Sequence, residues 1–291
     1  MTNPISAEHL YDARSSSYDN SWHPRFASHM VQLANPTPGE CVLDLACGTG
    51  LVSFLAAQAV GPKGRVTGVD VSSGMLDEAR KKLNENTSNL KFVKGNIERL
   101  SSLPELDELK GKVDLITCAS ALVLLADPSA AVKNWTEYLA PGGRIIVDVT
   151  HPRNQVVGIC MERVGKRLGR HVPHFRLNFR RKDDLLHVLK AAGLRDVQLW
   201  NLSQLDFSET ETDKLDDFLV DPARPRIERM YRVEDADEVF EATIQRGETY
   251  ASLREAQQEA REIFREEWKA LGDEKGEVKS LDWVWVAMGW K

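Results

Sequence analysis

The sequence has few cysteines, and the four that it contains are scattered. Cys41, Cys47, Cys118 and Cys160 form no Cys-x-x-Cys pair and show no spacing typical of a metal site. Such a pattern is typical of reduced thiols in an intracellular protein rather than of a disulfide framework. We therefore expect no metal centre and a cytoplasmic location.

Long apolar runs are also missing. No stretch approaches the about 18 apolar residues that a membrane-spanning helix requires. The first five residues lack the basic region and apolar run that mark a signal peptide. We therefore expect neither a membrane span nor a secretion signal.

Positive charge is in short supply as well. The 291 residues include 38 Lys and Arg against 44 Asp and Glu, a formal net charge of −6. Nucleic-acid binding needs clustered Lys and Arg to neutralise phosphates, so this balance argues against a nucleic-acid partner. The hydrophobic content of 42% is ordinary for a globular protein, and the length is ample for a buried core.

What the sequence does contain is a regular alternation of short apolar runs and amphipathic segments. Runs without polar alternation, bounded by Gly and Pro turns, are typical of parallel strands covered on both faces. Strands are predicted at 41–45, 65–69, 90–93, 113–117, 144–149, 196–202 and 282–290. Helices are predicted between them, among them 24–34, 182–192 and an acidic helical tract at about 209–272. This order predicts a doubly wound α/β sheet.

Two glycines follow the first predicted strand, in Asp44-Leu-Ala-Cys-Gly48-Thr-Gly50. Glycine has no Cβ, so the backbone approaches a ligand closely where open α/β sheets bind ligands. The dinucleotide fingerprint needs Gly or Ala at its third place, where this chain has Ser53. Asp44 would repel a pyrophosphate and attract the ammonium and sulfonium of S-adenosylmethionine. The residues therefore favour this methyl donor.

The second and third predicted strands also end in polar side chains. Asp70 is placed to accept both ribose hydroxyls of a nucleoside, although it is also a plausible capping acid for the next helix. Asn96 is placed to meet an adenine edge, with Ile97 against the ring, although a turn-forming Asn fits the local sequence nearly as well.

Five motifs in this order resemble those of class I S-adenosylmethionine-dependent methyltransferases. They are Asp44–Gly50, Val69–Ser72, Gly95–Ile97, Val113–Ile116 and Leu139–Gly143. The lead-in Tyr11-Asp12-x-x-Ser15-x-x-Tyr18-Asp19 resembles the opening of the ubiquinone/menaquinone-biosynthesis type. The resemblance covers about 8–150, then 180–200 and 282–290 as closing strands. It implies a seven-stranded Rossmann-like sheet whose last strand is antiparallel, with S-adenosylmethionine as the cofactor.

The resemblance also implies roles for single residues. Asp44 would bind the methionine amino group, Gly48 and Gly50 would line the donor, and Asp70 would hold the ribose. Tyr18 would close over the methionine end, with Tyr11 as a rival for that place. The remaining expected donor contacts are Ala46, Val71, Met75, Asn96, Ile97 and Ser120. The family often has Asp where Asn96 stands, so a weaker hydrogen bond to adenine is expected.

Methyl transfer from a sulfonium mainly requires that acceptor and methyl are aligned. A base is needed only where the acceptor must lose a proton. His151, just after the fifth predicted strand, is the first catalytic candidate, with a structural His-Pro turn as the alternative reading. Ser120 is the second, and His171 and His174 are weaker candidates in an expected active-site lid.

Two further absences limit the classes of acceptor that the sequence suggests. The chain after the fourth strand lacks the Asn/Asp-Pro-Pro-Tyr pattern of enzymes that methylate nucleic-acid amino groups, and a basic, aromatic-rich surface is missing. We expect a small organic acceptor, methylated on oxygen, with nitrogen, sulfur and carbon left open. The alternatives are a donor-binding regulator or scaffold without transfer activity, and a methyltransferase acting on a protein or lipid.

We expect a single methyltransferase domain over 1–291. Its expected parts are an N-terminal lid at 1–35, a donor-binding core at 36–150, a substrate-side lid and helical insertion at 151–180 and 204–281, and a last strand at 282–291. The amphipathic tract at 234–271 would serve as a folded lid or as the contact of a homodimer.

Overall fold

The computed structural model describes residues 8–9, 11–170, 172, 179–203, 215–245 and 249–291. Its centre is a seven-stranded sheet in the order β3-β2-β1-β4-β5-β9-β6. These strands are β1 (Cys41–Leu45), β2 (Arg65–Asp70), β3 (Leu90–Lys94), β4 (Val113–Cys118), β5 (Leu139–Thr150), β6 (Arg195–Leu202) and β9 (Val284–Trp290). β1 to β5 are parallel, and β9 runs antiparallel to both of its neighbours. The predicted fold is confirmed.

Helices cover both faces of the sheet, as the unbroken apolar strands require. α2 (His23–Ala34) and α3 (Leu51–Val60) pack on one face, and α5 (Pro128–Trp135) and α7 (Lys182–Ala191) pack on the other. Alternate residues of β1 therefore enter different cores: Val42 joins the α2/α3 core, and Leu43 joins the α5/α7 core. α4 (Ser73–Lys81) lies beside β2 and β3, and the Ser72 hydroxyl caps it by accepting the Met75 N–H.

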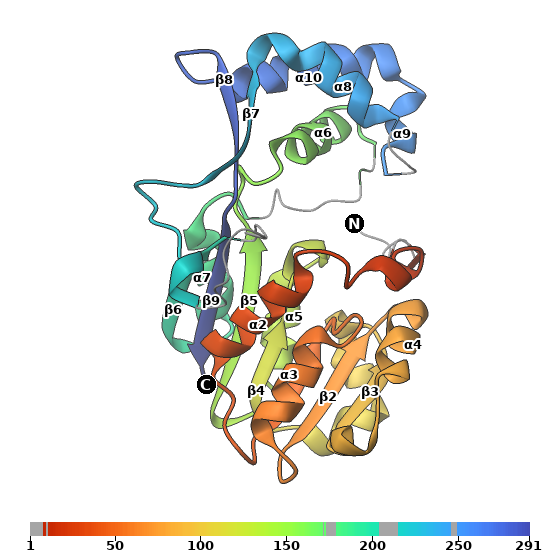
Figure 1. Cartoon of the computed structure of the whole chain (residues 1–291), viewed down its shortest axis with the longest axis vertical. Coiled ribbons are helices and arrows are strands. Elements are labelled where there is room, and N and C mark those ends of the chain that lie inside the picture. Colours follow the sequence, from red (N-terminus) through yellow and green to blue (C-terminus); the bar gives the residue numbers. More distant parts are fainter. Residues whose placement is uncertain (1–7, 10, 171, 173–178, 204–214, 246–248) are drawn as a thin grey trace.

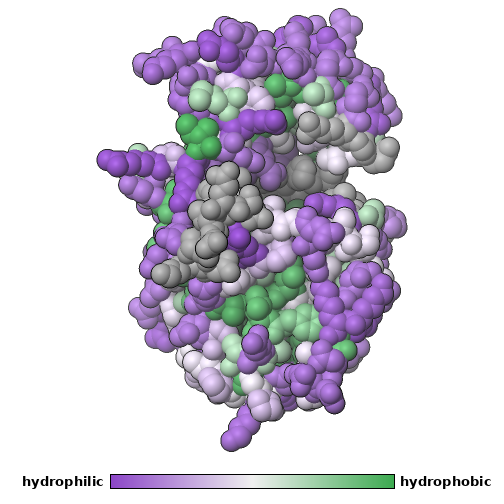
Figure 2. Space-filling model, viewed as in Figure 1, coloured by the Kyte–Doolittle hydropathy of each residue, from purple (hydrophilic) through white to green (hydrophobic). Residues whose placement is uncertain are grey.

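A second group of elements, which we call the cap, lies beyond the carboxyl ends of the parallel strands (Figure 1). It consists of α6 (Val156–Arg167), β7 (Ile227–Arg232), α8 (Ala236–Ile244), α9 (Ala251–Arg254), α10 (Gln257–Leu271) and β8 (Glu277–Leu281). The cap has a core of its own, which contains Phe240, Phe264 and Trp268. The outer face of the cap is hydrophilic, whereas hydrophobic side chains show over α2 and α3 (Figure 2).

The cap differs from the predicted helical tract at 209–272. β7 interrupts that tract and pairs with β8 in an antiparallel ribbon, so the prediction of helix over 227–232 is wrong. The reason is a pairing with residues about 50 positions later, which the local sequence does not reveal. β5 also begins at Leu139 rather than at 144. The division of the chain into lid, core and insertion stays a prediction.

Three of the strand ends that face the cap meet at one place. β5 enters the cap after Thr150, the cap returns to β9 at Val284, and β6 ends at Leu202. These three residues are neighbours in one row of the sheet, because Val284 pairs with both Thr150 and Leu202. No helix of the described residues is long and apolar enough to cross a membrane.

One ion pair joins the amino-terminal helix to the middle of the sheet. The Arg144 guanidinium donates to both carboxylate oxygens of Glu40 at 2.9 and 3.0 Å, and to the carbonyls of Ala34 and Asn35 at the end of α2. Both side chains are mostly buried, at 12% and 17% exposed. The planar fork therefore holds the end of α2, the turn before β1, and β5 together.

We predict that Arg144→Met lowers the free energy of unfolding by about 3 kcal/mol, because it leaves the Glu40 carboxylate buried without its partner. Chemical denaturation monitored by circular dichroism measures this value. Arg80→Ala is the control, since the Arg80–Asp77 pair is exposed and is expected to contribute less than about 0.5 kcal/mol. Equal effects of the two substitutions would contradict the anchoring role of Arg144.

Candidate active site

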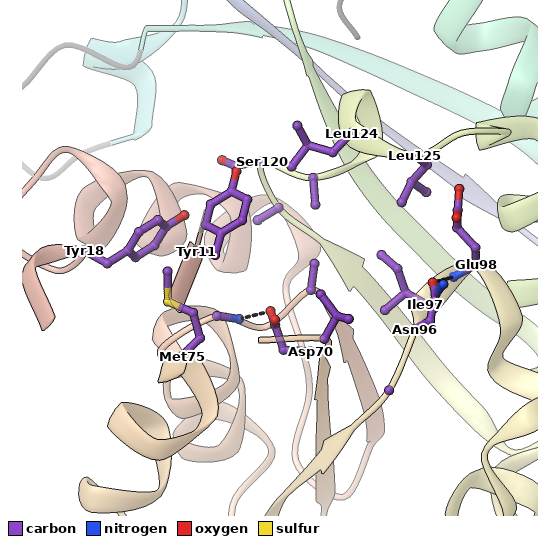
Figure 3. Close-up of a pocket in the computed structure, with 16 residues that line it drawn as sticks. Tyr11, Tyr18, Asp70, Met75, Asn96, Ile97, Glu98, Ser120, Leu124 and Leu125 are labelled. Carbon is purple, nitrogen blue, oxygen red and sulfur yellow. Dashed lines mark hydrogen bonds between the residues drawn. The ribbon is translucent and has the colours of Figure 1, made fainter. Parts of the chain in front are cut away.

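A cavity of about 780 Å³ opens at the carboxyl ends of β1 to β4 (Figure 3). Nine of the eleven residues expected to contact the donor line it. The two exceptions are Asp44 and Gly50. The sheet therefore brings together side chains that lie up to about a hundred positions apart in the sequence, from Tyr18 to Ser120.

Asp70, at the end of β2, fixes the glycine turn after β1. Its carboxylate accepts the Gly48 N–H and the Ser72 N–H, each at 2.8 Å. The side chain lines the cavity although it is only 7% exposed, and burial raises the pKa of its carboxyl. Gly48 has φ +54, and a Cβ there would lie 4.0 Å from both Met75 and Tyr18. The turn therefore leaves a narrow space between these side chains.

Asp44 lies in a second, smaller cavity that adjoins the first. The two cavities share Tyr18, Gly48 and Ser120 among their lining residues. Asp44 is 1% exposed and accepts hydrogen bonds from Ser53 Oγ at 2.5 Å and Thr117 Oγ1 at 2.7 Å. Burial raises the pKa of Asp44 to about 6 in spite of these bonds. Ser53, the residue that departs from the dinucleotide fingerprint, thus donates a hydrogen bond to the acid of this cavity.

Gly50 lines neither of these two cavities. It caps α3 with φ +86, and a Cβ at this position would lie 2.8 Å from the Phe54 ring and 2.9 Å from the Phe92 ring. The positive φ of the turn and this close packing explain why position 50 carries no side chain.

The lead-in contributes two Tyr–Asp pairs, Tyr11-Asp12 and Tyr18-Asp19. Both tyrosines line the larger cavity and lie side by side (Figure 3), with their ring centroids 6.4 Å apart. The two alternatives for covering the methionine end, Tyr11 and Tyr18, are therefore both at the cavity. Asp12 accepts from Ser72 Oγ at 2.5 Å and from Gly74 N–H at 2.8 Å, and these bonds lower the pKa of its carboxyl.

Asp19 accepts from Thr49 Oγ1 and from Lys82 Nζ, each at 2.5 Å. In each pair the tyrosine therefore faces the cavity, while the aspartate attaches the lead-in to the glycine turn or to α4. The tyrosines were visible in the sequence, but the anchoring function of the aspartates was not.

The far end of the cavity is formed after β3. Asn96 and Ile97 line it, and the Asn96 side-chain oxygen accepts the Glu98 N–H at 2.9 Å. Asn96 is thus both a turn residue and a lining residue. Glu98 also lines the cavity and accepts the Ala126 N–H at 2.5 Å. The sequence gives no signal for Glu98, because its partner lies in a loop 28 residues away.

At the end of β4 the backbone of Ser120 has φ +58, which is the left-handed region. Its N–H donates to Asp148 Oδ1 at 2.6 Å. Asp148, on β5, is 2% exposed, and burial raises the pKa of its carboxyl to about 7. Sequence reasoning missed this residue. A single acid within the apolar run 145–149 is the signal that could have identified it, because acids are seldom buried without a partner.

His151 lies outside the residues that line either cavity. Its ring stacks on Trp283 at 4.3 Å, and its Nδ1 accepts the Arg153 N–H at 3.0 Å. Burial lowers the pKa of His151 to about 4. These contacts, beside the row where sheet and cap join, agree with the structural-turn alternative, and a role as base stays a prediction. His171 and His174 lie outside the described residues.

Comparison with known proteins agrees with the fold. The family model described as methyltransferase domain matches residues 36–189. A demethylmenaquinone methyltransferase of Lactococcus lactis is 28% identical over 219 residues, covering 72% of this chain and 79% of that protein. A ubiquinone/menaquinone biosynthesis C-methyltransferase of Shewanella woodyi is 32% identical over 150 residues; the match covers 50% of this chain and 57% of that relative's length.

A solved structure extends the likeness to the whole chain. The putative methyltransferase in complex with the Haloferax volcanii Trm112 activator superposes with a TM-score of 0.55 at 18% identity, over 96% of both chains. At this identity the likeness concerns the fold alone. The family match, in contrast, includes more than half of the sequence and every motif from the glycine turn to β5. The chain therefore belongs to the methyltransferase domain family, as an S-adenosylmethionine-dependent class I member of the ubiquinone/menaquinone-biosynthesis-like type.

Proposed function

We propose that this protein transfers the methyl group of S-adenosylmethionine to a small organic acceptor. The observation that carries the proposal is the placement of two buried carboxyls, Asp44 and Asp70, on either side of the Gly48 turn in adjoining cavities. Asp44 is suited to the ammonium group of the donor's amino acid part. Asp70 is suited to the two ribose hydroxyls of its nucleoside part.

The residues present fit the donor in chemistry. Asp70 would accept the ribose hydroxyls, and Asp44 would pair with the ammonium group. Asn96 would offer its amide to the adenine edge, since its oxygen is already used in the turn. The space beside Gly48, between Met75 and Tyr18, suits the thin sulfonium region of the donor.

When bound, S-adenosylmethionine supplies an electrophilic methyl group and a neutral thioether leaving group. The chain's own contribution is to orient it and to keep water away. Tyr11 and Tyr18 would cover the methionine end, and burial raises the pKa of Tyr18 above its ordinary range, so its hydroxyl stays neutral. No general base is required where the acceptor is already nucleophilic.

The acceptor side of the cavity favours an apolar molecule. Ala121, Leu124 and Leu125 line it, with Ser120 and Glu98 as the neighbouring polar groups, and each of these two already has a hydrogen-bond partner. The names of the two relatives describe methylation of demethylmenaquinone and carbon methylation in quinone biosynthesis. These observations support a small acceptor with an apolar ring. Transfer to oxygen, expected from the sequence, stays a prediction beside transfer to carbon.

A screen of metabolite extracts with isotope-labelled S-adenosylmethionine tests the proposal. The expected result is a mass shift of one methyl group in a small molecule, and fragmentation then assigns the atom that receives it. Saturable donor binding without any methylated small molecule would favour a regulator or scaffold, and label in protein or lipid would favour the other alternative. Binding of NAD instead of S-adenosylhomocysteine would overturn the proposal.

We predict that Asp70→Asn weakens S-adenosylhomocysteine binding by about 1.5–3 kcal/mol, roughly ten- to a hundredfold, because it removes charged hydrogen bonds to the ribose. Isothermal titration calorimetry measures the affinity, and a thermal melt reports whether the fold survives. Asp77→Asn, an exposed acid on α4, is the control. An unchanged affinity in a folded Asp70 variant would remove this residue from the ribose site.

Asp44 gives the donor site a pH dependence of known sign. Its pKa in the free protein is about 6, so the carboxylate that attracts the ammonium group is lost below that pH. We predict that affinity falls on acidification below pH 6, by up to about tenfold per pH unit. The Asp44→Asn variant should bind more weakly and show a shallower slope over the same range. Parallel slopes for the two proteins would contradict the assignment.

The stability of the unliganded fold should change in the opposite direction. The folded pKa of about 6 lies above the reference value of 3.8, so the folded state holds the extra proton between these values. The stabilisation from this group is present below pH 3.8 and is lost as the pH rises through 6. Denaturation of wild type and Asp44→Asn across this range separates the effect from other groups.

A further inference from the structure

The wall of the larger cavity depends on one disfavoured backbone conformation. Ser120 has φ +58, which is unfavourable for a residue with a Cβ. It is the point where the chain leaves β4 and turns into the segment Ala121–Leu125. Ser120 lines both cavities, so its conformation affects the two parts of the site at once.

The segment that follows continues the same wall. The Leu124 N–H donates to the Ala121 carbonyl at 2.8 Å, and Leu122 is fully buried beneath the turn. Ala121, Leu124 and Leu125 line the cavity. A rotation of the Ser120 backbone to an ordinary conformation would redirect this whole segment, because the chain direction after β4 is set there.

The group that holds this conformation comes from the neighbouring strand. Asp148 Oδ1 accepts the Ser120 N–H at 2.6 Å, a short hydrogen bond. Asp148 is 2% exposed and stands among buried apolar residues of β5, where an acid is costly unless it serves a partner. Neither of the cavities includes Asp148 in its lining, so it acts on them through Ser120.

We infer that Asp148 is a positioning residue of the donor site, which holds Ser120 in its left-handed turn and thereby sets the wall from Ser120 to Leu125. The inference rests on the proposed function, since it assumes that the cavity binds the donor. A role through negative charge is the alternative, since the charge of Asp148 contributes, after burial, to raising the pKa of the Tyr18 phenol. The two roles require different chemistry, acceptance of a hydrogen bond or negative charge, and substitutions separate them.

The test measures S-adenosylhomocysteine affinity by calorimetry with the full chain. Asp148→Asn keeps an acceptor oxygen without the charge and is expected to bind within about threefold of wild type. Asp148→Leu has a similar shape without an acceptor and is expected to bind about tenfold more weakly, the effect of about 1.4 kcal/mol. Adding Ser120→Gly to Asp148→Leu should recover most of the affinity of the Ser120→Gly single variant, which accounts for any contact of the Ser120 side chain with the donor, because glycine adopts positive φ without steric cost.

The matched control is Asp114→Leu. Asp114 also accepts a backbone N–H across the sheet, that of Cys41 at 2.8 Å, but at the opposite end of β4. Its loss should leave the affinity unchanged. Equal losses in Asp148→Asn and Asp148→Leu would overturn the inference in favour of the charge, and so would a double variant that recovers nothing.

Hydrogen exchange of the peptide covering 119–125 provides a readout that does not depend on the ligand. Slow exchange at Ser120 is expected in wild type and Asp148→Asn, and fast exchange in Asp148→Leu, or in Asp148→Ala if the leucine variant does not fold. Uniform exchange across these proteins would overturn the inference. A wild type that binds no S-adenosylhomocysteine would overturn the proposed function, whereas normal binding by every Asp148 variant would overturn this inference alone.

Discussion

The hydrogen bonds of the Asp70 carboxylate are the constraint on which the site depends. By accepting the N–H groups of Gly48 and Ser72, this one side chain joins the turn after β1 to the turn after β2. The first turn opens α3 and the second opens α4, so two strand–helix units are brought into one register at the cavity. Asp12 then attaches the lead-in to the same α4 terminus through Ser72 and Gly74. The lead-in residues are thus held by the same turn that Asp70 fixes.

Two buried acids, Asp44 and Asp70, lie near the carboxyl ends of the neighbouring strands β1 and β2, and burial raises the pKa of each. Buried carboxyls are costly, because their charged forms are poorly solvated. A ligand that carries an ammonium and a sulfonium relieves this cost. The two carboxyls therefore favour a cationic donor over the pyrophosphate of a dinucleotide.

The sequence predicted the central sheet well, because apolar runs and glycine turns are local signals. It also predicted the acids that end strands, since the carboxyl ends of parallel strands meet at one edge. It failed where a partner is distant: Glu98 bonds to a loop 28 residues away, and β7 is a strand only because β8 pairs with it. Asp148 lies within β5 rather than at its end, so the pattern of polar residues at strand ends does not indicate it. His151 was favoured by its place in the chain, but its stack on Trp283 is a long-range contact.

The single row in which Thr150, Val284 and Leu202 meet gives the molecule a modular character. β5 leads into the cap and the cap leads back into β9 at this row, while the donor cavity is built on β1 to β4. We therefore expect insertions, deletions and exchanges within the cap to leave the register of the donor-binding strands unchanged. A chain of this design would tolerate change above the sheet while the donor cavity below it keeps its shape.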